Sequence, residues 1–339
     1  MRLRMADVAA KAGVSASTVC RALKGDPQIP AATRERVRAV AQAMGYAPDP
    51  LLSAFASRKR GRTKGTDVTT IAFVTRFSSR LGWRQNPYYK RLFDGAQARA
   101  EQLGYQLENF WLGEPGMSGE RLSSILYHRG ISAVFVAPLP RARSHISLAW
   151  EKFSCITVGY SLLRPNLHRV SSHNFHGILV CIRELRRLGY RRIGFCVFKD
   201  TSKRVDDLWL AGFLLSQRSI ADLKLSCLVV DDDTAPGIPD WCRKEKIEVL
   251  IGAEPGVLVH LRRSGYFPGK IDYVAGSWND QEPEIAGVDQ RPDRIGATAV
   301  DLVIGQLQRG ERGVPEVSST MMVEGEWRPG PSLSRVWTG

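Results

Sequence analysis

The stretch MADVAAKAGVSASTVCRALKG, residues 5–25, decides the fold of the first part of this chain. Its first half carries apolar residues at helical spacing on one stripe: Met5, Val8, Ala9 and Ala12. Gly13 follows, and glycine readily takes the left-handed conformation that ends a helix. Ser15 is a common N-cap residue and predicts a second helix after it. Two short helices around a glycine turn favour a helix-turn-helix over an ordinary helical hairpin.

Positive charge gathers around this motif. The 339 residues have a net charge of +14. Residues 1–66 hold thirteen lysines and arginines against four acidic residues, which leaves a much smaller excess for the rest of the chain. Neutralising phosphates releases their counterions and so drives binding to nucleic acid. The charge therefore favours a nucleic-acid partner for this segment over a solvated basic face or a membrane surface.

Two further helices are predicted before residue 58. One spans about residues 31–44, and the other is short, from Leu51 to Ser57, with Asp49 as an N-cap and Pro50 in its first turn. A helix this short is not stable alone in water. We expect it to fold on DNA and to insert between base pairs, the alternative being a linker helix that packs on the rest of the protein.

From Thr69 onward, short apolar strands alternate with amphipathic helices. Strands are expected at residues 69–75, 105–112, 132–138, 191–198, 223–230 and 247–253. Helices are expected near residues 88–105, 118–129, 174–188, 204–217 and 236–245. This pattern is typical of parallel βαβ units, and because it starts again after Ser161 it predicts two lobes. Ligands of such folds gather at the carboxyl ends of the strands.

Residues 5–25, together with TRERVRAVAQAMGYAPDP at residues 33–50, resemble the head of the lactose-repressor (LacI/GalR) family of bacterial transcription regulators. The family pattern D-V-A-x-x-A-G-V-S-x-x-T-V-S-R-x-L is matched almost throughout, with Cys20 in place of a serine. AGVDQRPDRIGATAVDLV, residues 286–303, is similar to a landmark of the family's body. The resemblance implies an α/β protein with an all-α, lambda-repressor-like head and a two-lobed, periplasmic-binding-protein-like body.

The expected boundaries follow from this reading. Residues 1–57 are predicted to form the helix-turn-helix head with its hinge helix, and residues 58–68, which include the polar run RKRGRTKGT, a linker. Residues 69–339 are predicted to form the domain that binds an effector and dimerises.

The resemblance also implies which residues contact DNA. Its base-reading positions and its minor-groove wedge fall on four residues: Ala16, Ser17, Arg21 and Phe55. Arg21 lies one helical turn after Ser17, and an arginine can bind guanine O6 and N7 in a bidentate pair. The Ala16 methyl group suits a thymine methyl, and the Ser15 and Thr18 hydroxyls suit phosphates.

Candidate effector-binding residues are aromatic and charged residues at helix starts and strand ends: Tyr88, Tyr89, Arg204, Asp207, Trp209 and Trp278. The alternative for the aromatic residues is packing in the core. Trp209 and Trp278 stand where family members place an arginine and an aspartate, so we expect a pocket that is more aromatic and less charged. Because aromatic faces suit the apolar side of a sugar ring, a sugar or glycoside is the expected effector.

The sequence carries no pattern that indicates catalysis, metal binding or disulfide bonds. The sequence has no G-x-S-x-G, Walker loop or H-E-x-x-H motif, so we predict no enzyme, cofactor or metal. The six cysteines form no C-x-x-C pair and are expected to be reduced structural thiols. His173 and His176 are expected to cap a helix or to line a cleft. With no apolar signal region and no run of about 18 apolar residues, a cytoplasmic location away from membranes is expected.

These features predict a transcription regulator, a repressor, that binds double-stranded operator DNA and responds to a small effector. One head covers a half-site, and PSLSRVWTG at residues 331–339 carries no heptads, so a homodimer is expected. The rival hypothesis is a cytoplasmic ligand-binding protein or enzyme whose basic head binds nucleic acid nonspecifically. A secreted solute-binding receptor is a third, disfavoured by the missing signal and by the helix-turn-helix.

Overall fold

The computed structural model describes residues 5–23, 26, 28–44, 46, 69–231 and 237–335. The chain divides into two compact units, Met1–Asp67 and Val68–Gly339, which are described separately. The predicted hinge helix with Phe55 and the predicted linker at residues 58–68 lie outside the described residues.

Three helices build the first unit, α1 (Met5–Ala12), α2 (Ala16–Leu23) and α3 (Ala31–Ala43). They pack around a small core of buried side chains: Val8, Ala9, Ala12, Val19, Ala22, Ile29, Val37 and Ala41. Gly13 has a φ of 64°, and the Ser15 hydroxyl accepts a hydrogen bond of 3.1 Å from the backbone N–H of Thr18. The predicted turn and N-cap are therefore confirmed, and with them the helix-turn-helix.

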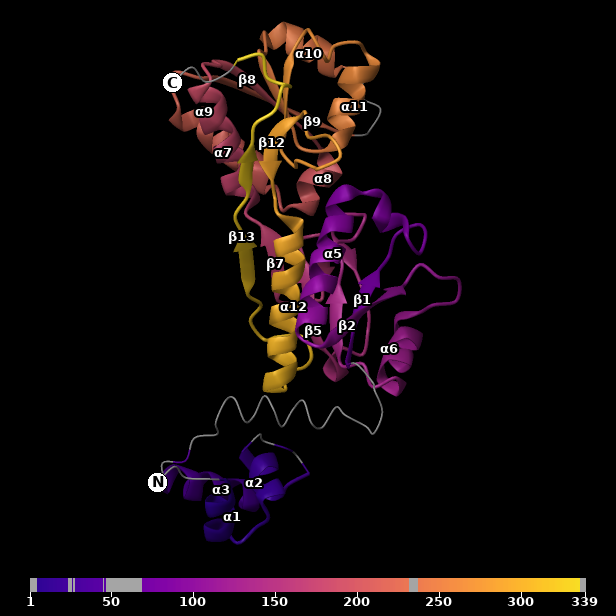
Figure 1. Ribbon diagram of the computed structural model, residues 1–339, viewed down its shortest axis with the longest axis vertical. Coiled ribbons are helices and arrows are strands. Elements are labelled where there is room, and N and C mark those ends of the chain that lie inside the picture. The colour runs from indigo at the N-terminus through magenta and orange to yellow at the C-terminus, as the bar shows by residue number, and fades with distance from the viewer. Residues whose placement is uncertain are drawn as a thin grey trace. The chain divides into compact units, whose positions relative to one another are not determined.

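The second unit has two lobes, each built on one six-stranded sheet in the described residues (Figure 1). The sheet of lobe 1 is entirely parallel, in the order β13 (Thr320–Val323), β7 (Arg169–Ser172), β5 (Ser154–Val158), β3 (Ala133–Val136), β1 (Thr69–Thr75) and β2 (Tyr105–Trp111). Its helices are α5 (Pro87–Gln102), α6 (Gly119–His128) and α12 (Pro292–Arg309), with the 3₁₀ helices η1 (Gly82–Gln85) and η2 (Trp150–Lys152). A small sheet pairs β4 (Ser144–His145) with β6 (Leu162–Arg164).

The sheet of lobe 2 is parallel except for one edge strand. Its order is β14 (Glu326–Arg328), β12 (Ala286–Asp289), β11 (Asp272–Ala275), β10 (Val249–Gly252), β8 (Arg192–Phe198) and β9 (Lys224–Val230), with β14 antiparallel to β12. Its helices are α7 (Asn174–Arg187), α8 (Lys199–Arg204), α9 (Leu208–Ser219), α10 (Ile238–Glu245) and α11 (Pro255–Arg263). Buried apolar strands covered by helices match the predicted βαβ units.

One predicted helix differs from the structure. The helix expected near residues 204–217 begins at Leu208 instead, after the separate short helix α8. Asp206 and Asp207 both have a φ of 56°, a left-handed conformation that interrupts a right-handed helix. Aspartate tolerates this conformation better than most residues, which is the local reason for the break.

Within the described residues the chain passes between the lobes three times. It leaves β7 for α7 at His173, returns from β12 to α12 at residues 290–291, and passes from β13 to β14 at residues 324–325. The two predicted lobes are confirmed, but the alternation along the sequence did not predict that α12 and β13 return to lobe 1. In the described part of the chain no helix is long and apolar enough to cross a lipid bilayer.

Helices α5 and α12 lie side by side on lobe 1 and approach each other closely (Figure 1). A Cβ atom on Gly296 of α12 would lie 2.1 Å from the carbonyl oxygen of Leu92, and one on Gly95 of α5 would lie 2.2 Å from that of Asp293. Both distances are far inside van der Waals contact, and the obstacle is backbone. The two glycines therefore set the spacing of the helices.

We expect Gly296→Ala to lower the free energy of unfolding of the second unit by about 1–3 kcal/mol, because the added methyl group forces the helices apart. Gly305→Ala, on the same helix, is the matched control. Its added Cβ meets only the end of the Arg309 side chain, and alanine favours a helix over glycine. Urea titrations followed by tryptophan fluorescence test this, since all eight tryptophans lie after residue 68. Equal stability of the two variants would contradict the proposed role of Gly296.

Candidate DNA-binding and effector sites

Arg21 projects from the last turn of α2 and is held by two side chains of the following loop. Its Nε donates to Asp26 Oδ2 at 2.8 Å, and its Nη2 donates to Gln28 Oε1 at 2.6 Å. These bonds use Nε and one of the two N–H groups of Nη2, and the guanidinium has three further N–H donors, two on Nη1 and one on Nη2. A planar pair of N–H donors of this kind matches O6 and N7 of guanine.

Asp26 is itself fixed by its surroundings. Its backbone N–H donates to the carbonyl of Arg21 at 3.1 Å, and its Oδ1 accepts from the backbone N–H of Gln28 at 2.9 Å. Its carbonyl accepts from Arg34 Nη1 at 3.1 Å. The hydrogen bond from Arg21 holds the pKa of Asp26 below its ordinary value, so the carboxylate is charged at neutral pH. The role of Asp26 was not predicted, because its only local signal is an acidic residue five positions after the arginine.

The other predicted DNA contacts lie at the start of α2. Ser15, Ala16 and Ser17 are exposed. The Ser15 hydroxyl lies 2.9 Å from the Thr18 hydroxyl in addition to capping the helix. Val19 and Ala22 are buried on the opposite side of α2, so its exposed face carries the residues that were expected to contact DNA.

A cavity of about 470 Å³ lies between the two lobes of the second unit. Five of the six predicted effector residues line it: Tyr88, Tyr89, Arg204, Trp209 and Trp278. Asp207 does not line the cavity, which corrects the sixth assignment. It occupies the left-handed turn before α9, and its carboxylate accepts hydrogen bonds from Ser202 Oγ and Lys203 Nζ.

Two tyrosines bring the start of α5 into the cavity wall. Asn86 caps this helix, because its Oδ1 accepts from the backbone N–H of Tyr88 at 2.9 Å. Burial raises the pKa of Tyr88 to about 12, so its hydroxyl stays neutral. The Tyr89 hydroxyl accepts from Arg204 Nη2 at 2.7 Å, and this bond joins lobe 1 to lobe 2 beside the cavity.

Two buried polar atoms in the cavity wall have no hydrogen-bond partner among the described residues. These are Asn174 Oδ1, on a residue that is 4% exposed, and Trp278 Nε1. One is an acceptor and the other a donor, and leaving such an atom unpaired costs about 1–3 kcal/mol. Asn174 was not predicted to line the cavity, and neither were Glu254 and Arg263, two wall residues that add charge to a pocket that was expected to carry less.

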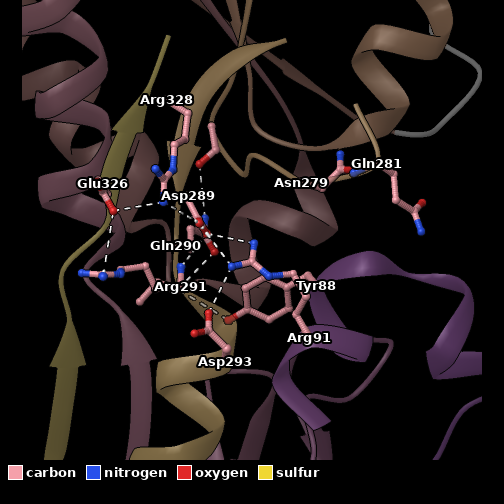
Figure 2. A network of polar contacts seen from close by, with 12 residues as sticks. Tyr88, Arg91, Asn279, Gln281, Asp289, Gln290, Arg291, Asp293, Glu326 and Arg328 are labelled. Carbon is pink, nitrogen blue, oxygen red and sulfur yellow. Dashed lines mark hydrogen bonds and ion pairs between the residues drawn. The ribbon is translucent and has the colours of Figure 1, made fainter. Parts of the chain in front are cut away.

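An ion pair between Arg91 of α5 and the buried carboxylate of Asp289 links α5 to the second crossing between the lobes, residues 290–291 (Figure 2). Arg91 donates through Nη1 and Nη2 to the two carboxylate oxygens of Asp289, at 3.0 and 3.2 Å, and through Nη2 to Asp293 at 3.1 Å. Asp289 is 2% exposed and also accepts from the backbone N–H of Arg291 at 2.9 Å. Arg328 approaches the same carboxylate to 3.7 Å.

Gln290, the residue after Asp289, connects the Arg91–Asp289 ion pair, called the clamp below, to the cavity. Gln290 lines the cavity, accepts a hydrogen bond of 3.1 Å from Ser172 Oγ and donates one of 3.3 Å to the carbonyl of Gly276. Ser172 Oγ in turn lies 3.5 Å from the Tyr88 hydroxyl. The cavity wall and the second crossing therefore share one hydrogen-bond network.

His173 and His176 lie at the start of α7, where the sequence suggested a helix cap or a cleft wall. His173 occupies the N-cap position of α7, but its side chain makes no capping hydrogen bond, so the capping alternative is wrong for His173. His173 does line a small pocket together with Asn174 and Trp209, as the other alternative expected. The Nδ1 atoms of both rings face Glu324, at 2.7 and 2.6 Å from its two oxygens. Cys155, Cys181, Cys196, Cys227 and Cys242 are free thiols, as predicted, and burial raises the pKa of the first three of them.

A helix-turn-helix unit and a two-lobed α/β unit with an interlobe cavity, in one chain, define the class of bacterial transcription regulators. Residues 4–49 match the model of the family described as bacterial regulatory proteins, lacI family. The HTH-type transcriptional regulator PtxS of Pseudomonas putida is 31% identical over 365 aligned positions that cover 97% of each chain. The chain belongs to the lacI family.

Solved structures have the same fold at lower identity. The regulator CelR in complex with cellobiose has a TM-score of 0.57 and 20% identity, over 98% of this chain and 100% of that one. The lac repressor dimer bound to operator and the anti-inducer ONPF has a TM-score of 0.54 and 18% identity, over 98% and 99% of the chains. Alignments to several other curated regulators are partial and span 27% to 54% of the length of those proteins.

Proposed function

We propose that this protein is a cytoplasmic transcription regulator, a repressor, whose affinity for operator DNA is set by a small hydroxyl-rich effector bound between its lobes. The observation that carries this proposal is the interlobe cavity, with its aromatic wall and its two unpaired polar atoms, in a chain that begins with a helix-turn-helix. Both parts belong to one chain, so the cavity is the natural place for a signal that controls DNA binding.

The cavity supports a sugar or glycoside as the effector. Its volume of about 470 Å³ falls in the usual range of small-molecule sites. Trp209 and Trp278 offer aromatic surface, and a sugar hydroxyl group can donate to Asn174 Oδ1 or accept from Trp278 Nε1. The cellobiose bound to CelR, a protein of the same fold, agrees with this class of ligand.

The first unit supports operator DNA as the partner. It carries most of the excess positive charge and presents Arg21, Ala16 and Ser17 on an exposed helix face. One such unit covers a half-site, so we propose a homodimer on a pseudo-palindrome. In the same proposal Phe55 inserts into the minor groove, and the effector shifts operator affinity by its differential affinity for two lobe arrangements.

A thermal-shift screen of the full-length protein against a sugar library tests the effector. A sugar that binds the folded state raises the Tm and changes operator affinity. We expect Asn174→Leu to keep the Tm of the free protein, because it removes an unpaired buried acceptor, and to weaken the sugar about tenfold or more. Asn109→Leu is a control outside the cavity wall. It removes the hydrogen bonds of Asn109 with Thr75 and Arg80, so its own Tm without ligand is the reference, and the variant should still respond to the sugar.

Operator footprinting tests the DNA partner. One protected palindrome is expected, whereas uniform, salt-sensitive protection of any DNA would support the rival hypothesis of a nonspecific head. If no sugar or glycoside changes the Tm or the operator affinity, the proposed class of effector is wrong.

A further inference from the structure

Two histidines and a glutamate converge where the first and third crossings run together. His173 ends the first crossing and His176 lies one turn into α7, while Glu324 lies in the third crossing, 148 residues further along the chain than His176. The backbone N–H of His173 donates to the carbonyl of Val323 at 2.9 Å, so the two crossings are in direct contact.

The three side chains have the geometry of a ligand set. One ligand atom from each of them lies within 4.8 Å of the other two. The imidazole rings are 5.4 Å apart, and both turn their Nδ1 atoms to the same carboxylate. The Glu324 side chain is 59% exposed, so it can change rotamer at little cost and water can reach the open positions of a bound ion.

The chemistry of this set selects a class of ion. Imidazole nitrogens suit zinc and other late transition metals, whereas magnesium and calcium prefer oxygen ligands throughout. Two histidines and one carboxylate, with water in the remaining position, form a well-known type of open zinc site.

We propose that His173, His176 and Glu324 bind a divalent transition-metal ion of the zinc type. The ion ties the first crossing to the third, and because both segments connect the lobes it restricts the movement of one lobe against the other. The positive end of the α7 dipole opposes a cation, so we expect binding at micromolar rather than lower concentrations of free metal. This inference does not depend on the identity of the effector.

Zinc titration of the tag-free, metal-stripped, full-length protein tests the site, by calorimetry and by competition with a chromogenic chelator. We expect one zinc ion per chain, displaced by nickel or cobalt and unaffected by excess magnesium. Glu324→Gln and His176→Gln should each weaken zinc binding about tenfold or more, while His145→Gln, which changes an exposed histidine in lobe 1, should leave it unchanged.

The outcomes decide the proposal in both directions. Circular dichroism and the Tm show whether each variant is folded, and Glu324→Gln, which changes an exposed residue, keeps the test valid if His176→Gln does not fold. Loss of zinc binding in a folded Glu324→Gln protein, with anomalous scattering from zinc at this cluster in the wild type, supports the site. Absence of stoichiometric binding, or binding that both variants retain, overturns it.

Discussion

Replacing Arg91 by alanine is expected to lower the free energy of unfolding of the second unit by about 3–5 kcal/mol, because it leaves the buried carboxylate of Asp289 without its bidentate charged partner. Asp289 is 2% exposed and receives two hydrogen bonds from Arg91. Its remaining contacts, the backbone N–H of Arg291 and the more distant Arg328, do not replace a bidentate guanidinium. Urea titration of the second unit measures the loss.

Lys90→Ala is the matched control for this prediction. Lys90 is the neighbour of Arg91 on α5 and pairs with Asp94 at 2.8 Å, but the two side chains are 56% and 54% exposed. Exposed pairs contribute about 0–1 kcal/mol, so the control should be close to wild type. The double variant Arg91→Met with Asp289→Leu should recover part of the stability, because it removes both charges at once. If Arg91→Ala is as stable as Lys90→Ala, the clamp does not hold the second crossing.

The clamp also bears on how the cavity is held. Tyr88 and Arg91 are three residues apart and therefore lie on the same face of α5. Tyr88 lines the cavity from lobe 1, while Arg91 forms an ion pair with Asp289, the last residue of β12 in lobe 2. A change in the angle between the lobes must therefore move Tyr88 and the second crossing together. For that reason we expect a variant that breaks the Arg91–Asp289 ion pair to change the affinity for the sugar as well as the free energy of unfolding.

Local signals in the sequence predicted the elements and much of the site. Gly13 and Ser15 marked the turn and the cap of the helix-turn-helix, and the structure has both. Apolar runs between turns predicted the strands, because burial on both faces leaves a continuous apolar pattern. Tyr88, Trp209 and Trp278 stand at helix starts and a strand end, which in this fold meet at one cleft.

Contacts between distant parts of the chain had no such signal. Arg91 and Asp289 are 198 residues apart, and neither residue type marks a burial site without knowledge of its partner. Glu324 was missed for the same reason, so His173 was assigned a role as a helix cap or in a cleft wall and not one with a distant partner. The course of α12 back to lobe 1 is likewise fixed by packing at Gly296, which a helical pattern alone does not reveal.

Arg21→Ala is expected to weaken binding to the cognate operator by about 1–3 kcal/mol for each half-site, or about 2–6 kcal/mol for the proposed dimer, and to relax the preference at one base pair per half-site. The remaining N–H groups of its guanidinium are the reason, because one on Nη1 and one on Nη2 can donate together to one guanine. Titrations of operators substituted at each position, at fixed salt, measure both effects. Equal weakening on random DNA would show that Arg21 contacts only phosphate.

Asp26→Ala separates the positioning of Arg21 from its direct contact. Without Asp26 Oδ2 the arginine keeps its charge but loses the partner that fixes its Nε, so discrimination between bases should fall while binding to random DNA changes little. Arg38→Ala, at an exposed position of α3, removes charge without touching Arg21 and is expected to leave the base preference unchanged. Because Asp26 also bonds the backbone of its own loop, the Tm of each variant must be compared with wild type. A folded Asp26→Ala protein that retains full base preference would mean that Arg21 orients itself on the DNA without this support.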